Sequence, residues 1–576
     1  MRNSSGLLAG IAALAARATA QTQCNGTFAD LTAAEFLEAA NPAWNLGNTL
    51  DAIPDEGSWN NPKVEAATFD LVKAAGYKSV RIPVTYTHHF LSEAPDYEVD
   101  PAWLQRVSDV IDFALERDLL VVTNVHHDSW EWADVSADGA DVAAIQEKLR
   151  ALWVQVGSKL ACKPSTVAFE SINEPPASTA EQGANVNKLN EVFLEAIAET
   201  GDWNTRRVVT LAGGNNDPTK TSQWFEPPAN VANPWALQIH YYSPYDFAFS
   251  AWGKTVWGSD ADEAAMSAEL GLVRGNFSDV PIYVGEFDAT PRSTESAARW
   301  KWFDFFARET AKIGASIAVW DNGMDHLDRE TGEWDPATND IIAAAIDGVA
   351  NSLPDSTEDA AAEEQWTSAY IFHRAGNEVV DKELPWLFNG NTVTGVTTAD
   401  GTALAEGDDY VVGDASITFT SQFLLSYLDA SSAPGVYETV TVSFSAGAAF
   451  PVQLVLWDVP TLGSTSGTAA PGSDLSIPVE WAGLERLATV KMQAEDGTYL
   501  VDDWTQYLGP LQQARGVSDP LFSLTLPLSF FSLLLSSFLL LFAWREKALR
   551  IKYSRLTLYR RLGSRSGRSK ATTSSS

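Results

Sequence analysis

Two glutamates near the ends of short apolar segments are the residues of this chain best suited to acid–base chemistry. Glu174 follows the apolar stretch 167–173 and is followed by two prolines, and Glu286 lies near the end of the stretch 280–287. Each stretch is typical of a buried strand bounded by turn residues. One glutamate at a strand end is usually a solvated side chain. Two carboxyl groups at strand ends of one sheet suit glycosidic bond cleavage, which needs a proton donor and a nucleophile or base.

Other polar and aromatic side chains come at the same end of neighbouring predicted strands. They are Arg81, Asn124, His126, His127, Asp128, Asn173, His240, Tyr242 and Trp320. The carboxyl ends of parallel barrel strands meet at one face, so we expect these side chains to line one cavity. Six strand ends with such residues indicate a site much more strongly than any single residue does.

The run His126-His127-Asp128 has a second interpretation as a metal site. Neighbouring residues on a strand point to opposite faces, which makes it difficult for both histidines to bind one ion. We therefore predict no metal and no organic cofactor, and we expect His127 to be a packing or rim residue.

Eight short apolar stretches alternate with segments of helical period between residues 44 and 350. The predicted strands are 44–48, 79–83, 119–126, 167–173, 207–212, 236–242, 282–287 and 316–320. Asn61-Pro62 and Asp100-Pro101 are each predicted to open a helix, because a capping side chain followed by proline favours a helix start. Eight strand–helix units predict a (β/α)₈ TIM barrel. The alternative, a doubly wound open sheet, would separate several of these strand ends.

The composition and the predicted secondary structure of the chain change beyond the predicted barrel. We predict a catalytic domain over 21–352, an acidic linker over 353–365, and an immunoglobulin-like β-sandwich over 366–460, where short β segments alternate with Gly, Asn and Asp. A Gly/Ser/Thr-rich linker leads to 473–518, which is too short to form a stable sandwich alone.

The 576 residues carry a formal net charge of −36 that is unevenly distributed. Residues 519–576 hold ten Lys and Arg against two acidic residues, so this tail carries +8 and the rest of the chain −44. A body this acidic excludes non-specific nucleic-acid binding. A neutral polysaccharide is compatible with it, and we expect a monomer.

The chain contains 21 Trp, and these side chains can stack on sugar rings. Six of them fall near predicted loop ends on the expected face of the site, and each is predicted either to stack on substrate or to pack in the core. They are Trp44, Trp59, Trp130, Trp132, Trp252 and Trp257.

The N-terminal segment 1–20 has a basic residue, an apolar run and a small-residue cleavage site, which predicts a secretory signal and an extracellular protein. Cys24 and Cys162 are the two cysteines of the chain. They could pair in an oxidising compartment, but their spacing gives no geometric support for a bond.

The C-terminal segment 521–544 is uncharged and is followed by the basic tail 545–576. One interpretation is a membrane anchor with its basic side in the cytoplasm. The other is an abnormal terminus, such as translated intron. Pro527 and the many serines count against an anchor, so we expect a membrane partner only if this segment is genuine.

Four motifs of residues 40–350 together resemble glycoside hydrolase family 5, the cellulase-type retaining barrel enzymes. They are Asn-Glu-Pro at 173–175, Arg-Ile-Pro at 81–83, His-Tyr-Tyr at 240–242 and Gly-Glu-Phe at 285–287. The runs 100–107 and 124–128 look most like endoglucanase and xyloglucanase members. Residues 366–460 resemble an X2-type immunoglobulin-like module, and 475–509 resemble the start of a family 46 carbohydrate-binding module.

This resemblance implies a role for each predicted site residue. Glu174 would be the acid/base and Glu286 the nucleophile, and Asn173 would hold the sugar 2-hydroxyl. Arg81 and Tyr242 would bond Glu286 and keep it ionised. His126 and His240 would orient the substrate and Glu174. Trp320 would stack beneath the sugar at the cleavage point.

The sequence therefore predicts a secreted, retaining endo-β-1,4-glucanase acting on cellulose-type glucan. The alternatives are a xyloglucanase or another β-glycan endohydrolase on the same frame. An alternative of a different class is a non-catalytic wall-glycan-binding protein, whose signature would be the loss of one carboxyl group.

Overall fold

The computed structural model describes residues 24–229, 231–249, 254–291, 294–362, 365–429, 432–464 and 478–484. The predicted signal segment 1–20, the apolar segment 521–544 and the basic tail 545–576 lie outside these residues, as does most of 473–518. Within the described part of the chain, no helix combines the length and apolarity needed to span a bilayer.

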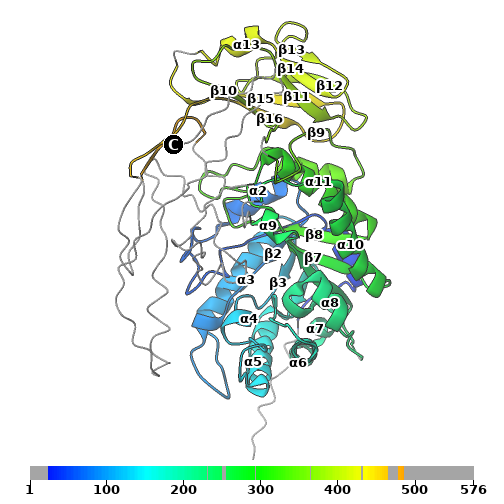
Figure 1. The fold of residues 1–576 in the computed structure, drawn as a ribbon. Helices are drawn as coiled ribbons and strands as arrows, with labels where there is room; N and C mark the ends of the chain where they lie inside the picture. Colours follow the sequence, from blue (N-terminus) through cyan, green and yellow to red (C-terminus); the bar gives the residue numbers. More distant parts are fainter. Residues whose placement is uncertain are drawn as a thin grey trace, which may run out of the picture.

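Eight parallel strands close into a barrel, with helices around it (Figure 1). The strands are β1 (Ala43–Asn45), β2 (Ser79–Ile82), β3 (Leu120–Thr123), β4 (Val167–Glu170), β5 (Val209–Ala212), β6 (Trp235–Tyr241), β7 (Ile282–Phe287) and β8 (Ala315–Val319). Closure is completed by β1, which pairs with both β2 and β8. The TIM barrel is confirmed and the open sheet is excluded, because an open sheet would leave two unpaired edges.

Strands β3 and β4 end earlier than the sequence predicts. The apolar stretches 119–126 and 167–173 continue beyond Thr123 and Glu170, where the strands stop. The residues that follow remain buried and keep single backbone hydrogen bonds to neighbouring segments, such as His126 N–H to the Val84 carbonyl, but they no longer form a regular ladder. Apolar composition therefore marks burial at these positions, and strand pairing ends sooner.

Helices and short helical turns connect the strands. They are α1 (Ala33–Ala40), α2 (Ala66–Ala74), η1 (Thr87–His89), α3 (Pro101–Leu115), α4 (Asp128–Glu131), α5 (Val142–Leu160), α6 (Ala180–Ala198), α7 (Asp202–Arg206), η2 (Gly214–Asn216), α8 (Pro218–Trp224), α9 (Tyr245–Ala248), α10 (Asp260–Asn276), α11 (Ser296–Lys312) and α12 (Thr338–Ile346).

One of the two predicted proline-led helix starts is wrong. Asp100 caps α3 as predicted, because its carboxylate accepts from the backbone N–H of Ala102 at 2.8 Å. Helix α2 begins only at Ala66. The side-chain amide of Asn61 instead donates to the carbonyl groups of Asn48 and Asn322 at 3.0 and 2.8 Å. It ties the loops after β1 and β8 together at the open end of the barrel.

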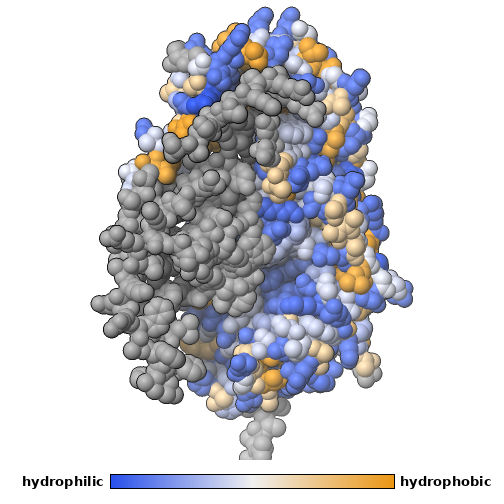
Figure 2. All heavy atoms as spheres, viewed as in Figure 1, coloured by the Kyte–Doolittle hydropathy of each residue, from blue (hydrophilic) through white to orange (hydrophobic). Residues whose placement is uncertain are grey.

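The opposite end of the barrel is closed by α1. Phe36 and Leu37 of this helix pack in one buried cluster with small and apolar strand residues such as Ala168 and Ala236. The face visible in Figure 2 is mostly hydrophilic where the described barrel is exposed, as expected for a chain whose apolar residues fill the interior. The carboxyl ends of the strands, with the predicted site residues, lie at the end of the barrel away from α1.

Two four-stranded sheets form a β-sandwich module beside the barrel (Figure 1). Their orders are β10-β16-β15-β12 and β13-β14-β11-β9. The elements are β9 (Leu353–Pro354), β10 (Tyr370–Arg374), β11 (Lys382–Leu387), β12 (Val393–Thr397), β13 (Tyr410–Val412), β14 (Ser416–Phe419), α13 (Ser421–Leu425), β15 (Gly435–Phe444) and β16 (Phe450–Trp457), followed by the small pair β17 (Thr461–Leu462) and β18 (Val479–Glu480).

The acidic stretch 353–365, predicted as a linker, is instead part of this junction. Its first residues form β9, which pairs with β11 of the module. Its acidic side chains bind the barrel, since Lys301 of α11 lies 3.2 Å from Asp355 and 3.3 Å from Glu358. The ring of Trp300 packs on Phe450 of β16 with centroids 5.2 Å apart. The low hydrophobicity of 353–365 therefore reflects acidic side chains that form ion pairs with the barrel. Composition alone does not distinguish such a segment from a free linker.

Cys24 and Cys162 form a disulfide that ties the N-terminal segment to the turn after α5. We expect its reduction to lower the free energy of unfolding by about 2–5 kcal/mol, because the bond restricts the unfolded chain over a long loop. Urea unfolding with and without a reductant measures this. A Cys24→Ser/Cys162→Ser variant is the control, and its midpoint should not respond to the reductant. An unchanged midpoint in fully reduced wild type would contradict the expectation.

Candidate active site

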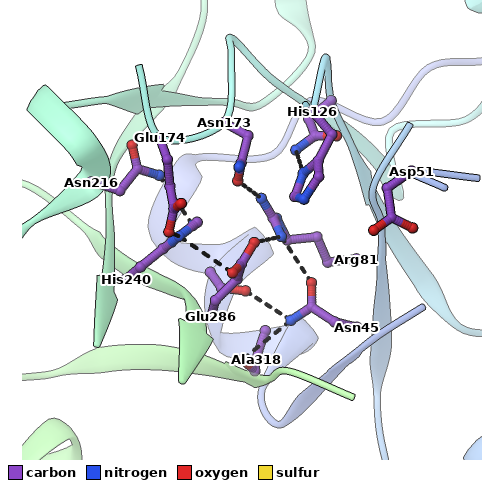
Figure 3. Close-up of polar contacts among 12 residues, drawn as sticks. Asn45, Asp51, Arg81, His126, Asn173, Glu174, Asn216, His240, Glu286 and Ala318 are labelled. Carbon is purple, nitrogen blue, oxygen red and sulfur yellow. Dashed lines mark hydrogen bonds and ion pairs between the residues drawn. The ribbon is translucent and has the colours of Figure 1, made fainter. Parts of the chain in front are cut away.

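The residues predicted to do chemistry lie together at the open end of the barrel (Figure 3). They come from six strands or the turns that follow them: Arg81 in β2, His126 after β3, Asn173 and Glu174 after β4, His240 in β6 with Tyr242 just beyond it, Glu286 in β7 and Trp320 after β8. Barrel closure thus brings segments far apart in the sequence to one cavity.

Glu174 and Glu286 face each other across this cavity (Figure 3). One carboxylate oxygen of each and one ring nitrogen of His240 all lie within 4.8 Å of one another. His240 Nδ1 is 2.7 Å from Oε1 of Glu174 and 3.5 Å from Oε2 of Glu286. Two carboxyl groups this close can act on a single glycosidic bond from its two sides.

The backbone of Glu174 is strained. Its φ angle is 40°, in the left-handed region that costs a non-glycine residue about 1–3 kcal/mol. Hydrogen bonds on both sides hold it there: Asn173 N–H donates to the Val125 carbonyl at 2.9 Å, and Asn215 N–H donates to the Pro175 carbonyl at 2.8 Å. This conformation turns the carboxyl group toward the cavity immediately after the strand ends.

Arg81 joins the polar groups beneath the cavity. Its guanidinium donates to Oε1 of Glu286 at 2.6 Å, to Oδ1 of Asn173 at 2.8 Å and to Oδ1 of Asn45 at 2.9 Å. It also forms two bonds with Glu170, at 2.6 and 2.7 Å. Asn173 and the Glu286 carboxylate are thus fixed relative to each other by one rigid, planar group.

Glu170 is a residue that the sequence analysis missed. It lies fully buried inside β4, where its charge is balanced by Arg81 and by a 2.8 Å bond from the Asn124 amide. The signal was present, because an ionisable residue within an otherwise apolar strand needs a buried partner. Arg81 therefore serves two carboxylates, and only part of its charge is available to Glu286.

Glu286 has the two donors expected to keep it ionised, but its burial opposes ionisation. Arg81 and Tyr242 both donate to its carboxylate, the phenol at 2.9 Å, as predicted. Burial nevertheless raises the pKa of Glu286 above its ordinary value, although His240 and Arg81 oppose the rise. The donors lower the pKa of a carboxyl group, but the loss of water around it inside the barrel raises the pKa, and the donors alone do not reveal this second effect.

Glu174 has the environment of a general acid. Its side chain keeps 23% of its surface exposed toward the cavity, so substrate can reach it. Burial of the carboxyl group raises the pKa of Glu174 to about 7, against the smaller opposing effects of Arg81 and His127. Glu286 accepts from a cation and a phenol, whereas the hydrogen bond found at Glu174 is with His240. The two carboxyl groups therefore lie in different environments, as acid–base pairs require.

His126 and Trp320 come after β3 and β8 and contact each other through their rings. Their rings are stacked, with centroids 5.8 Å apart and an interplanar angle of 4°. Asn124 Oδ1 accepts from the Val84 N–H at 3.1 Å, so its amide nitrogen is the atom that donates to His126 Nδ1 at 3.0 Å. Nε2 of His126 then carries the proton, and burial holds the pKa of His126 well below its ordinary value. The ring is a neutral donor.

The tryptophans near the site divide into two groups. Trp59 and Trp130 are 40% and 48% exposed and both contact His127, with ring centroids 5.4 and 4.6 Å from it. Trp44 and Trp257 are fully buried and belong to the core. Of the other two, Trp132 is partly buried and donates to Asp128, and Trp252 lies outside the described residues.

The premise of the argument against a metal ion is also wrong. His126 and His127 follow β3 and do not alternate on it, and their rings lie edge to face at 4.4 Å. One ligand atom of each lies within 4.8 Å of a carboxylate oxygen of Asp51. Against an ion, Asn124 leaves His126 with a proton on Nε2, and Asp128 accepts bonds from Tyr86, Thr87 and Trp132. The absence of a metal stays a prediction.

Comparison with known proteins gives the same assignment over most of the chain. Residues 40–326 match the family described as cellulase (glycosyl hydrolase family 5), and residues 365–454 match carbohydrate binding domain X2. Endoglucanase B of Paenibacillus lautus is 30% identical over 492 residues, which are 82% of this chain and 83% of that protein.

Two solved structures are also similar. One is a tri-modular GH5 (subfamily 4) endo-β-1,4-glucanase from Bacillus licheniformis complexed with cellotetraose, with a TM-score of 0.74, 34% identity, and coverage of 86% of this chain and 94% of that one. The other is a family 5 xyloglucanase from Paenibacillus pabuli in complex with ligand, with a TM-score of 0.50, 28% identity, and coverage of 54% and 99%.

The closed barrel and the facing carboxyl groups at its open end are those of a glycoside hydrolase. With the relatives above, the assignment becomes specific: the chain belongs to glycosyl hydrolase family 5 and carries an X2 carbohydrate-binding domain after its barrel.

Proposed function

We propose that this protein is a secreted, retaining endo-β-1,4-glucanase that cleaves cellulose-type glucan by double displacement. The observation that carries the proposal is the separation of Glu174 and Glu286, whose nearest carboxylate oxygens lie within 4.8 Å of each other. Retaining enzymes hold their carboxyl groups about 5–5.5 Å apart, whereas inverting enzymes need about 6.5–9.5 Å to admit water. Oxygens this close, each within 3.5 Å of His240 Nδ1, favour the shorter, retaining arrangement and so support attack by a carboxylate.

In the first step the Glu286 carboxylate attacks the anomeric carbon and forms an ester with the sugar. The glycosidic C–O bond breaks, and the proton of Glu174 passes to the departing oxygen. In the second step the Glu174 carboxylate takes a proton from water, and the water oxygen attacks the anomeric carbon. The ester bond breaks, which restores the Glu286 carboxylate and the protonated Glu174.

The contacts of the surrounding residues support these steps. Asn173 lies between Glu174 and Arg81, where its amide can meet the sugar 2-hydroxyl as positive charge develops on the ring. Trp320 offers a ring face beside His126 for the sugar at the cleavage point. Tyr242 holds Oε2 of Glu286. Substrate binding thus aligns the anomeric carbon with a fixed nucleophile.

Xyloglucan is the second candidate substrate, because the Paenibacillus pabuli relative is a xyloglucanase. Reducing-sugar release from cellulose, xyloglucan, mannan and lichenan separates the candidates. We expect cleavage of cellulose-type glucan, and higher activity on xyloglucan would replace it as the main substrate. Absence of release from every glycan would favour the non-catalytic wall-binding protein, although both carboxyl groups are present.

Secretion is supported by the disulfide between Cys24 and Cys162, since such bonds persist in oxidising compartments. The X2 domain supports a polysaccharide partner. Trp300 of α11 contacts Phe450 of this domain, and Lys301 pairs with Asp355 just before it, so the domain lies directly beside the barrel.

A further inference from the structure

His240 is held from both sides of its ring. Nδ1 faces the two carboxyl groups, at 2.7 Å from Glu174 and 3.5 Å from Glu286. Nε2 faces two side-chain amides, those of Gln238 and Asn216, each at 3.1 Å. Neither amide was identified from the sequence. Gln238 lies fully buried within β6, and Asn216 ends the short turn η2 (Figure 3 shows Asn216).

The orientation of these amides decides which nitrogen of His240 carries the proton. Thr210 donates its hydroxyl proton to Oε1 of Gln238 at 2.6 Å, so the NH₂ group of Gln238 faces the imidazole. Asn216 places its amide nitrogen 3.1 Å from the same ring nitrogen, but its Oδ1 is buried with no hydrogen-bond partner among the described residues, so the assignment depends on Gln238. An N–H donor on Nε2 requires a lone pair there, and the carboxylate oxygens on the other side require an N–H at Nδ1.

We propose that Gln238 and Asn216 are positioning residues that lock His240 as the neutral tautomer with its proton on Nδ1. This inference rests on the proposed function, in which Glu174 is the acid/base. The lock opposes two harmful states. A bare Nδ1 would accept the catalytic proton from Glu174, and an imidazolium would favour the ionised form of Glu174.

The locked tautomer serves both forms of Glu174. Nδ1–H donates to Oε1 when the carboxyl group is ionised, and it still donates to Oε1 as a carbonyl oxygen when the proton is on Oε2. His240 therefore directs the acid proton to the oxygen that is free to face the substrate. Burial lowers the pKa of His240 to about 4, which agrees with a neutral ring at the working pH.

The charged and titratable groups facing His240 come from four strands and are Arg81, His126, Glu170, Glu174 and Glu286. The carboxylates favour a proton on the ring, and Arg81 disfavours it. The amides act at Nε2 and the nearer carboxylates at Nδ1, so both favour a proton on Nδ1, and only the amides disfavour a proton on Nε2.

Gly285 leaves the space that the lock occupies. A Cβ atom at this position would lie 2.6 Å from Nε2 of Gln238 and 3.2 Å from Nε2 of His240. Any larger residue would push the amide off the imidazole. The glycine of the Gly-Glu-Phe motif thus has a physical role next to Glu286.

The most direct test is ¹⁵N NMR of the imidazole groups in ¹⁵N-histidine-labelled wild type between pH 5 and 8. Comparison with His240→Asn assigns the resonance among the seven histidines. We expect a protonated Nδ1 and an unprotonated Nε2 throughout. A protonated Nε2 would overturn the inference.

Two substitutions of Gln238 test the consequence for catalysis. Gln238→Glu replaces a donor with an acceptor, so Nε2 gains a proton and the pKa of Glu174 falls. We expect kcat/KM at pH 7 to fall at least about tenfold, with the alkaline limb of its pH profile about one unit lower. Gln238→Met keeps the side-chain volume and adds no acceptor. The alkaline limb of its kcat/KM profile should therefore stay at the wild-type pH. Equal pH profiles for the two variants would indicate packing alone and overturn the inference.

The outcome also separates this inference from the proposed function. Wild type that cleaves no glucan but shows the Nδ1 tautomer would refute the function and leave the lock standing. Active wild type that loses activity in Glu286→Gln yet carries its His240 proton on Nε2 would refute the lock alone.

Discussion

Replacing Glu286 with Gln is expected to lower kcat/KM at least about a thousandfold on every glucan that wild type cleaves. The amide keeps the size of the carboxyl group but cannot form the glycosyl ester. It also turns one acceptor oxygen into a donor where Arg81 or Tyr242 now donates. Both changes act at the reacting atom.

Initial rates on soluble glucan measure this loss, and the thermal midpoint checks that the variant is folded. Glu147→Gln is a matched control, because Glu147 is an exposed residue of α5 away from the cavity. We expect wild-type activity from the control. Near-normal turnover by Glu286→Gln would remove Glu286 as the nucleophile.

Replacing Glu174 with Gln is expected to cost about 10²–10⁴ in kcat/KM on glucan, the range that general acid–base catalysis provides. The loss should be much smaller for the bond-breaking step of aryl cellobiosides, whose leaving groups need no proton. In wild type the acid form of Glu174 decreases above its pKa of about 7, so kcat/KM should fall tenfold per pH unit beyond it.

The pH dependence of kcat/KM on a soluble glucan, whose leaving group needs the proton, separates this role from a structural one. The alkaline limb near pH 7 should be present in wild type and absent from Glu174→Gln. A limb that persists unchanged in the variant would belong to another group, and Glu174 would lose its assignment as the acid.

The barrel and the two carboxyl groups could be predicted because both depend on local patterns. Apolar runs of strand length alternate with helical periods, and residues at the carboxyl ends of barrel strands must converge. A barrel fold therefore predicts that Glu174 and Glu286 lie close to each other. The helix start at Asp100 could be predicted for the same reason, since its cap and proline are adjacent in the sequence.

The residues that tune the site could not be found in this way. Glu170 and Gln238 lie within buried strands, where their type alone does not reveal which partner they meet. The raised pKa of Glu286 depends on the balance between burial and a shared cation, Arg81, which requires coordinates. The sequence analysis placed β9 in a linker because its pairing partner, β11, comes about thirty residues later.

The central claim is that the Glu286 carboxylate forms a covalent bond with the sugar. It is tested most directly with a 2-deoxy-2-fluoro-cellobioside that carries a good leaving group. The fluorine slows both formation and hydrolysis of the glycosyl ester, whereas the good leaving group speeds only its formation, so the ester accumulates. Peptide mass spectrometry after brief incubation should then find the fluorosugar on Glu286. An adduct on Glu174 or on any other residue would contradict the account.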